Sequence, residues 1–168
     1  YPTSYIPTNG AIATRLADEC NNGGNEQVIN SSEGVLYAEI SALANDATNR
    51  TIGILGDSSN YIELAYRDGA NEIRALIVSS GSVQSSMKFT TSDTTLFNKV
   101  AIKWKVNDAA LWINGVEVLT DTPLNIPSGL SELNFYKFDA TDNFYGKTKD
   151  VRVYDTALTD SELQQLTS

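Results

Sequence analysis

Aromatic and polar side chains that share a predicted strand face are the residues of this sequence most able to do binding chemistry. A flat aromatic ring covers the apolar side of a pyranose, and nearby polar side chains satisfy its hydroxyl groups. Trp112 is the leading platform, because strand alternation turns it away from the core. The further candidate carbohydrate-binding residues are Tyr37, Glu39, Tyr61, Arg67 and Tyr136. These residues predict a non-catalytic module that binds an oligo- or polysaccharide.

The orientation of Trp112 follows from the dipeptide Asn114-Gly115, which favours a two-residue hairpin turn. The turn predicts the cross-strand pairs Ile113 with Val116, Trp112 with Glu117 and Leu111 with Val118. Because side chains alternate along a strand, we expect the aliphatic residues of these pairs to face the core and Trp112 to face solvent. Trp104 is expected in the core, in phase with Val100, Ile102 and Val106. The alternative is that a neighbouring module or the N-terminal arm covers Trp112, which would then have a structural role.

The acidic residues are not spaced as a catalytic pair. Retaining glycosidases need two carboxyl groups about 5 Å apart, one protonated and one ionised. The nearest candidates form no such set: Glu39, Glu63, Asp68 and Glu72. The sequence contains no histidine, which excludes Ser-His and Cys-His nucleophiles and zinc sites that include histidine. We expect no enzyme activity, and a glycanase or polysaccharide lyase is the alternative.

One loop offers oxygen ligands for a metal ion. Asp139, Asp142 and Asn143 lie close together in the segment F-D-A-T-D-N-F, and Asp18 could approach from elsewhere. Calcium takes six to eight oxygen ligands, and carboxylates and amides are among those it prefers. Asp and Asn are also ordinary turn residues. The segment therefore predicts a possible structural calcium, and no other cofactor is indicated.

Composition narrows the range of partners. The chain has 168 residues and a formal net charge of −9, which favours one domain and disfavours binding to nucleic acid or an anionic membrane. No apolar run approaches the roughly 20 residues that a membrane span needs. The single Cys20 cannot form an internal disulfide. The acidic balance favours neutral or basic glycans, although four cations could bind an acidic one: Arg67, Arg74, Lys103 and Lys105.

Short strands separated by turns at roughly 8–12-residue spacing predict an all-β sandwich. The expected strands are Val28 to Asn30, Val35 to Leu43, Thr51 to Leu55, Tyr61 to Arg67, Glu72 to Ser79, Met87 to Phe89, Lys99 to Val106, Ala110 to Ile113, Val116 to Leu119, Leu133 to Phe138 and Lys147 to Tyr154. Asp68-Gly69 is a second hairpin dipeptide. Residues 1–15, with two prolines, are expected to form an extended arm on a single domain of residues 1–168.

The C-terminal residues predict a short helix after the final strand. Thr159 is a suitable N-cap, Glu162 completes a capping box, and Leu158 and Leu163 occupy hydrophobic-staple positions, so the helix should begin at Asp160. The pattern D-V-R-V-Y-D-x-A-L-T-D-x-E-L resembles the closing segment of concanavalin A-like or laminin G-like jelly rolls. The segment A-L-W-I-N-G-V-E-V resembles a hairpin of the same domains. The resemblance implies a two-sheet antiparallel jelly-roll sandwich with a short C-terminal helix.

A second resemblance concerns biological setting. The segment T-S-Y-I-P-T-N-G-A-I-A-T-R-L-A-D resembles a junction found before laminin G-like domains in bacteriophage tail and virion proteins. It implies a virion-surface or extracellular location and contact with other modules of a longer chain. In an oligomeric fibre, repetition would raise the affinity of a weak glycan site. A structural protein-protein interaction module of the virion is the alternative.

Overall fold

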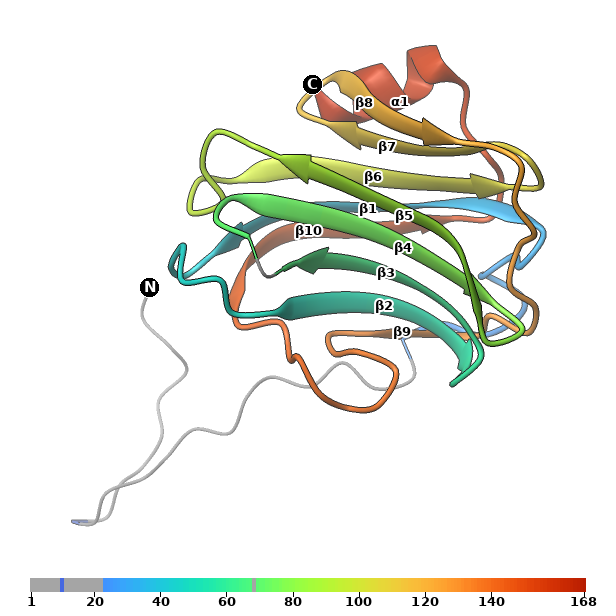
Figure 1. Cartoon of the computed structure of the whole chain (residues 1–168), viewed down its shortest axis with the longest axis horizontal. Helices are drawn as coiled ribbons and strands as arrows, with labels where there is room; N and C mark the ends of the chain where they lie inside the picture. The colour runs from blue at the N-terminus through green and yellow to red at the C-terminus, as the bar shows by residue number, and fades with distance from the viewer. Residues whose placement is uncertain (1–9, 11–22, 68) are drawn as a thin grey trace.

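The computed structural model describes residue 10, residues 23–67 and residues 69–168. Apart from Gly10, the predicted N-terminal arm lies outside the described residues, as do Asp18, Cys20 and Asp68. The described chain forms strands followed by one helix (Figure 1). Their bounds are β1 Glu33–Ala42, β2 Arg50–Asp57, β3 Asn60–Tyr66, β4 Glu72–Ser79, β5 Ser82–Thr90, β6 Asn98–Lys105, β7 Ala109–Ile113, β8 Val116–Asp121, β9 Glu132–Asn134, β10 Gly146–Tyr154 and α1 Asp160–Thr167.

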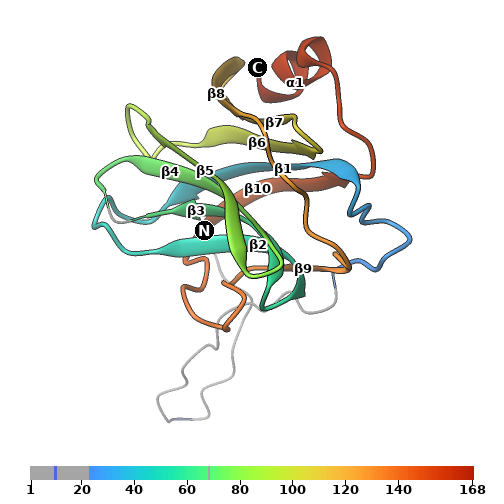
Figure 2. The same cartoon turned by 45° about the vertical axis from the view of Figure 1, so that its right-hand side comes forward.

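The strands form two antiparallel sheets that pack face to face (Figures 1 and 2). Sheet A has the strand order β10-β1-β6-β7-β8, and sheet B has the order β5-β4-β3-β2-β9. The predicted fold class, an all-β jelly-roll sandwich with a short C-terminal helix, is confirmed. Among the described residues, no helix has the length and apolar character that crossing a bilayer requires.

Alternate residues of each strand build the core between the sheets. In β3, Ile62, Leu64 and Tyr66 belong to the core, whereas Tyr61 belongs to a cluster on the outer face. Trp104 is fully buried in the core, as predicted, and its indole N–H donates to the carbonyl of Asn30 at 3.1 Å. The core therefore fixes which side chains of sheet B point outward.

The helix α1 packs on the outer face of sheet A over β6, β7 and β8. Thr159 caps this helix: its side chain accepts the backbone N–H of Glu162, whose carboxylate accepts the backbone N–H of Thr159 at 2.8 Å. This confirms the predicted helix start at Asp160. Leu163 is fully buried on sheet A, with Leu158 packed in the same cluster.

Trp112 lies on the outer face of sheet A, opposite Trp104, as predicted. The expectation that its indole is open to solvent is wrong, because the residue is only 6% exposed. Its buried cluster includes Tyr37 and Leu163, so α1 packs over it. Strand alternation predicts which face a residue occupies. It does not predict what packs on that face.

The hairpin at Asn114-Gly115 forms with positive φ at both residues and pairs Ile113 with Val116 and Trp112 with Glu117, as predicted. A bulge between Leu111 and Trp112 then shifts the register, so Leu111 pairs with Leu119 and the predicted pair with Val118 is wrong. Val116 and Val106 are exposed, because each lies at or beyond a strand end, and their expected core positions are also wrong.

The remaining predicted strands differ mainly at their ends. Residues 28–30 form a turn instead of a strand, and the predicted strand Met87 to Phe89 is part of the longer β5. The predicted strand Leu133 to Phe138 is shorter, since β9 ends at Asn134 and the chain then passes over the outer face of sheet B.

Candidate functional site

The outer face of sheet B carries a combination of aromatic and charged side chains, which we call the polar face. Cross-strand pairs order its residues in rows across β2, β3, β4 and β5. From one end, the rows are Leu55, Tyr61, Val78; then Gly53, Glu63, Leu76, Ser86; then Thr51, Ala65, Arg74, Lys88; and finally Glu72 with Thr90. Residues 135–145, the β9–β10 loop, lie against the β2 and β3 side of this face.

An aromatic group forms one end of the polar face. Tyr61 and Phe138 are stacked, with ring centroids 4.6 Å apart and an interplanar angle of 24°. Tyr136 packs in the same cluster, together with Leu55 and Val78. Burial raises the pKa of the Tyr61 hydroxyl, so this residue stays neutral. Phe138 and Tyr136 are partly exposed, and the ammonium group of Lys137 lies over the Phe138 ring, 5.0 Å from its centroid.

Gly53 lets the β9–β10 loop approach the sheet closely. A Cβ at this position would lie 3.2 Å from the carbonyl oxygen of Tyr136, so a larger residue would push the loop away. The backbone N–H of Thr51 donates to the carbonyl of Asp142 at 2.9 Å, which fixes the other end of the loop to β2. The loop therefore holds Phe138 and Asp142 over β3.

Four ion pairs cover the charged part of the polar face. Their members come from β3, β4, β5 and the β9–β10 loop. They are Glu63 with Arg74 at 3.3 Å, Glu72 with Lys88 at 3.5 Å, Arg67 with Asp142 at 3.1 Å and Lys137 with Asp139 at 3.1 Å. The charges of this set cancel.

Glu63 is the most unusual member of the set, because its carboxylate is fully buried. Burial raises its pKa, while the nearby guanidinium groups of Arg74 and Arg67 act in the opposite direction. One carboxylate oxygen faces Arg74, and the other has no hydrogen-bond partner among the described residues. The side chains of Thr51 and Asn134 are also buried without a partner there. Unpaired buried polar atoms are costly and are concentrated at sites that have a function or hold water.

The sequence-predicted binding residues divide between two faces on opposite sides of the core. Tyr61, Arg67 and Tyr136 lie on or beside the polar face. Trp112 and Tyr37 lie on the outer face of sheet A beneath α1. Glu39 is also in sheet A and pairs with Lys149 at 2.9 Å. The prediction that these residues share one sheet surface is therefore wrong, because alternation along a strand does not reveal to which sheet that strand belongs.

Two of the residues predicted to bind calcium form ion pairs with basic side chains. Asp142 binds Arg67, and Asp139 binds Lys137. The pKa of Asp139 is lowered, chiefly by the hydrogen bond from the Thr141 hydroxyl. Asn143 forms a bridge to Thr51 of β2. The described residues contain no group of three or more His, Cys, Asp or Glu side chains that could hold a metal ion, and a structural calcium at this loop stays a prediction.

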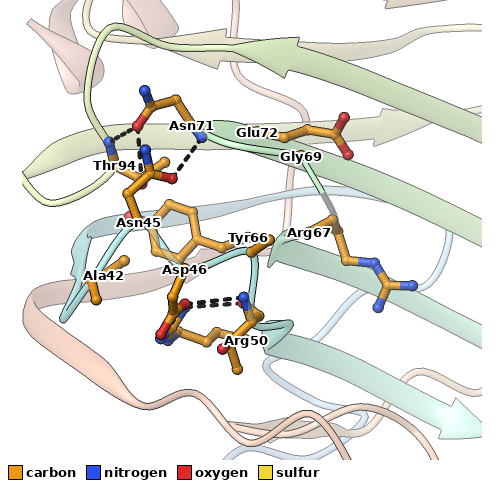
Figure 3. Close-up of a pocket in the computed structure, with 13 residues that line it drawn as sticks. Ala42, Asn45, Asp46, Arg50, Tyr66, Arg67, Gly69, Asn71, Glu72 and Thr94 are labelled. Atoms are coloured by element: carbon orange, nitrogen blue, oxygen red, sulfur yellow. Dashed lines mark hydrogen bonds and ion pairs between the residues drawn. The ribbon is translucent and has the colours of Figure 1, made fainter.

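A small pocket at one end of the sandwich is built from three loops (Figure 3). The Asn45 side chain accepts the backbone N–H of Asn71 at 3.0 Å, and the Asn71 side chain accepts that of Thr94 at 3.1 Å. The pocket volume is about 10 Å³, which is close to the space of one water molecule. Arg67 lines it, but its side chain points away from Asn45 (Figure 3). This pocket joins loops and is too small for a sugar.

Sequence reasoning missed Phe138 and Lys88 as members of a site. Phe138 lies in a loop, where no strand alternation indicates its direction. Lys88 could have been found, because its neighbours Met87 and Phe89 face the core and it therefore points outward, where it pairs with Arg74. That inference needed the β4–β5 pairing, which the predicted three-residue strand was too short to indicate.

Solved structures with the same fold include domains from three bacterial proteins. The CBM40 module of the Ruminococcus gnavus IT-sialidase, bound to α2,3-sialyllactose, is similar with a TM-score of 0.68 and 15% identity over 83% of this chain and 84% of that chain. Domain 4 of an extracellular arabinanase from Geobacillus stearothermophilus, in complex with arabinotriose, is similar with a TM-score of 0.67 and 16% identity. The match covers 86% of this chain and 70% of that chain. The binding domain of botulinum neurotoxin serotype D has a TM-score of 0.65 and 17% identity. The match covers 83% of this chain and 36% of that chain.

These identities are too low to show more than a shared fold. No curated protein matches the chain in sequence. A family model described as the concanavalin A-like lectin/glucanases superfamily matches residues 24–164, which include all ten strands. The chain therefore belongs to the concanavalin A-like lectin/glucanases superfamily.

Proposed function

We propose that this protein is a non-catalytic glycan-binding module and that the polar face binds an oligosaccharide. The observation that carries the proposal is the stacked pair Tyr61 and Phe138 beside a row of fixed polar side chains on one sheet face. An aromatic ring next to oriented hydrogen-bonding groups is the arrangement that sugar recognition requires. On the corresponding face of sheet A, Trp112 and Tyr37 are buried in the cluster that includes Leu163 of α1, which makes that face the weaker candidate.

The similar structures support this proposal. One is described in complex with sialyllactose and another with arabinotriose, and both are domains of enzymes that carry a separate activity in their names. These ligands were bound by those proteins. For this chain they favour oligosaccharide as the ligand class.

The acids of the polar face argue against glycoside hydrolysis. Each of the four forms an ion pair with a basic residue. Glu63, whose raised pKa would suit a general acid, is fully buried and cannot reach a glycosidic oxygen. Binding without bond cleavage is the function that this geometry supports.

Glycan-array binding followed by calorimetry tests the proposal with Phe138→Ala and Phe97→Ala as a matched pair. Both phenylalanines are partly or fully accessible and have a lysine over the ring, but Phe97 is beside sheet A. We expect Phe138→Ala to weaken saccharide binding roughly two- to tenfold, since loss of one stacking contact removes about 0.5–1.5 kcal/mol. Phe97→Ala should bind like the unaltered protein. Equal binding by both variants would place the site elsewhere.

The biological setting that we propose is the surface of a virion, as part of a phage tail protein with further modules. It is supported by the resemblance of residues 3–18 to virion-protein junctions. Immunogold labelling of intact phage particles with an antibody against this domain tests the location. Absence of label on particles whose denatured proteins react with the antibody would contradict it.

A structural protein-interaction module is the second candidate. Exposed apolar side chains at neighbouring ends of β1, β6 and β10 favour it: Leu43, Leu96, Phe97 and Tyr145. Sedimentation velocity of the protein and of Leu96→Glu compares the two ideas. Association lost in this variant, together with no binding on the glycan array, would favour the structural role.

A further inference from the structure

We infer that the saccharide recognised by the polar face is acidic and that its carboxylate is received by Arg74 and Lys88. This inference rests on the proposed function and adds the ligand class to it.

Arg74 and Lys88 are direct cross-strand partners on β4 and β5. Both point to the outer side of sheet B, because Ile73, Met87 and Phe89 beside them face the core. Directly opposed residues on one sheet face have Cβ atoms about 5 Å apart, and two like charges at this distance repel each other. Glu63 and Glu72 offset that repulsion within the protein, and one ligand carboxylate is close enough to reach both cations.

The protein's own acids lie beneath these cations. Glu63 is 0% exposed, whereas the side chain of its partner Arg74 is 13% exposed. The Glu72 side chain is 19% exposed, whereas that of its partner Lys88 is 48% exposed. In both pairs the cation is the outer member. A ligand approaching β4 and β5 therefore meets a guanidinium and an ammonium group, while the acids hold these groups in place.

The distance from the cations to the aromatic group suits a small saccharide. Along β4, the outward residues are Arg74, Leu76 and Val78, and Val78 pairs with Tyr61. Four residues of strand separate the first and last of these, which is about 14 Å. An acidic sugar unit can therefore lie beside Arg74 and Lys88, with a second unit reaching toward Phe138, because Leu76 between them is buried in the aromatic cluster. The exposed Ser86, opposite Leu76, can bond a hydroxyl group.

Local charge makes this face less repulsive to an acidic ligand than the rest of the surface. The four ion pairs are neutral as a set, so the formal charge of −9 comes from the remaining residues. The other predicted acid-binding cations, Lys103 and Lys105, are in sheet A and pair with Asp108 and Glu33. The expectation of neutral or basic glycans came from the total charge, which conceals the cations on the surface of the polar face.

The test is an array of acidic glycans, each printed beside a neutral counterpart: 3′-sialyllactose with lactose, and trigalacturonate with its carboxyl-reduced form. We expect at least tenfold tighter binding to the acidic member of one or more pairs. Calorimetry with the best ligand should show that this preference shrinks as sodium chloride rises from about 50 to 300 mM.

Lys88→Gln and Lys105→Gln provide the matched variants. Both lysines are exposed and pair with a glutamate, but only Lys88 lies on the polar face. Lys88→Gln should weaken binding of the acidic ligand roughly five- to tenfold, which is the effect of one charge-assisted contact. The affinity for the neutral counterpart should not change. Lys105→Gln should change neither. Arg74→Lys keeps the positive charge beside buried Glu63. It should still weaken binding of the acidic ligand, because lysine lacks the planar guanidinium that donates two parallel hydrogen bonds to a carboxylate.

The outcomes separate this inference from the proposed function. Equal affinity for acidic and neutral members, with binding still weakened in Phe138→Ala, would overturn the carboxylate assignment and leave glycan binding intact. No binding to any glycan on the array would overturn both.

Discussion

Glu63 shows how one residue can join stability and recognition. Its buried carboxylate holds Arg74, and this arrangement places a cation at the surface above an acid. Buried ion pairs contribute little net stability, because desolvation offsets the attraction between the charges. The pair is therefore better explained by the orientation that it imposes on Arg74 than by any contribution to the free energy of unfolding.

The raised pKa of Glu63 gives a pH dependence with a defined sign. A carboxyl group that binds its proton more tightly in the folded state stabilises the protein at low pH, and this contribution is lost as pH rises from about 4.5 through the folded-state pKa. Urea unfolding of the protein and of Glu63→Gln between about pH 3.5 and 8 should show a stability difference that moves in favour of the variant as pH rises.

Glu162→Gln is the control of opposite sign. Hydrogen bonds from Thr159 lower the pKa of Glu162, so its contribution is present above the unfolded-state pKa and is lost as pH falls. If the stability difference from the unaltered protein changes with pH in the same direction for both variants, Glu63 does not titrate as its burial requires.

At the scale of elements, α1 determines which sheet face is open. The helix is eight residues long, so it depends on packing for its stability. Leu163 supplies that packing against Trp112 and Tyr37. Without the helix, sheet A would present an aromatic surface resembling the platform predicted from the sequence.

Leu163→Ala tests the role of this helix. We expect the free energy of unfolding to fall by about 2–4 kcal/mol, since the side chain is fully buried, and Trp112 emission to shift to the red. Gln164→Ala, an exposed change in the same helix, should leave both unchanged. A blue emission maximum retained in Leu163→Ala would mean that other residues cover Trp112.

At the scale of the whole molecule, α1 and the polar face lie on opposite sides of the sandwich, with the core between the sheets. Coupling between distant sites needs an element with two arrangements that both sites influence. The described chain offers one packed arrangement of the two sheets. Loss of packing beneath α1 should therefore leave the polar face intact.

The expected outcome is that Leu163→Ala binds saccharide with an unchanged dissociation constant while it remains folded. Phe138→Ala should conversely weaken binding and leave Trp112 emission unchanged. Calorimetry well below the variant's melting temperature is the measurement. Weaker binding by folded Leu163→Ala would indicate that sheet A takes part in recognition, as the sequence first suggested for Trp112.

The sequence by itself determined the sandwich class, most strands, the helix start at Asp160 and the opposite orientations of the two tryptophans. These features depend on local signals: alternation, turn dipeptides and capping residues. Only the tertiary structure decided that α1 covers Trp112, that Tyr61 and Trp112 belong to different sheets, and that Phe138 stacks on Tyr61. These contacts join segments far apart in the chain, and their partners are set by sheet order and packing, which local periodicity does not encode.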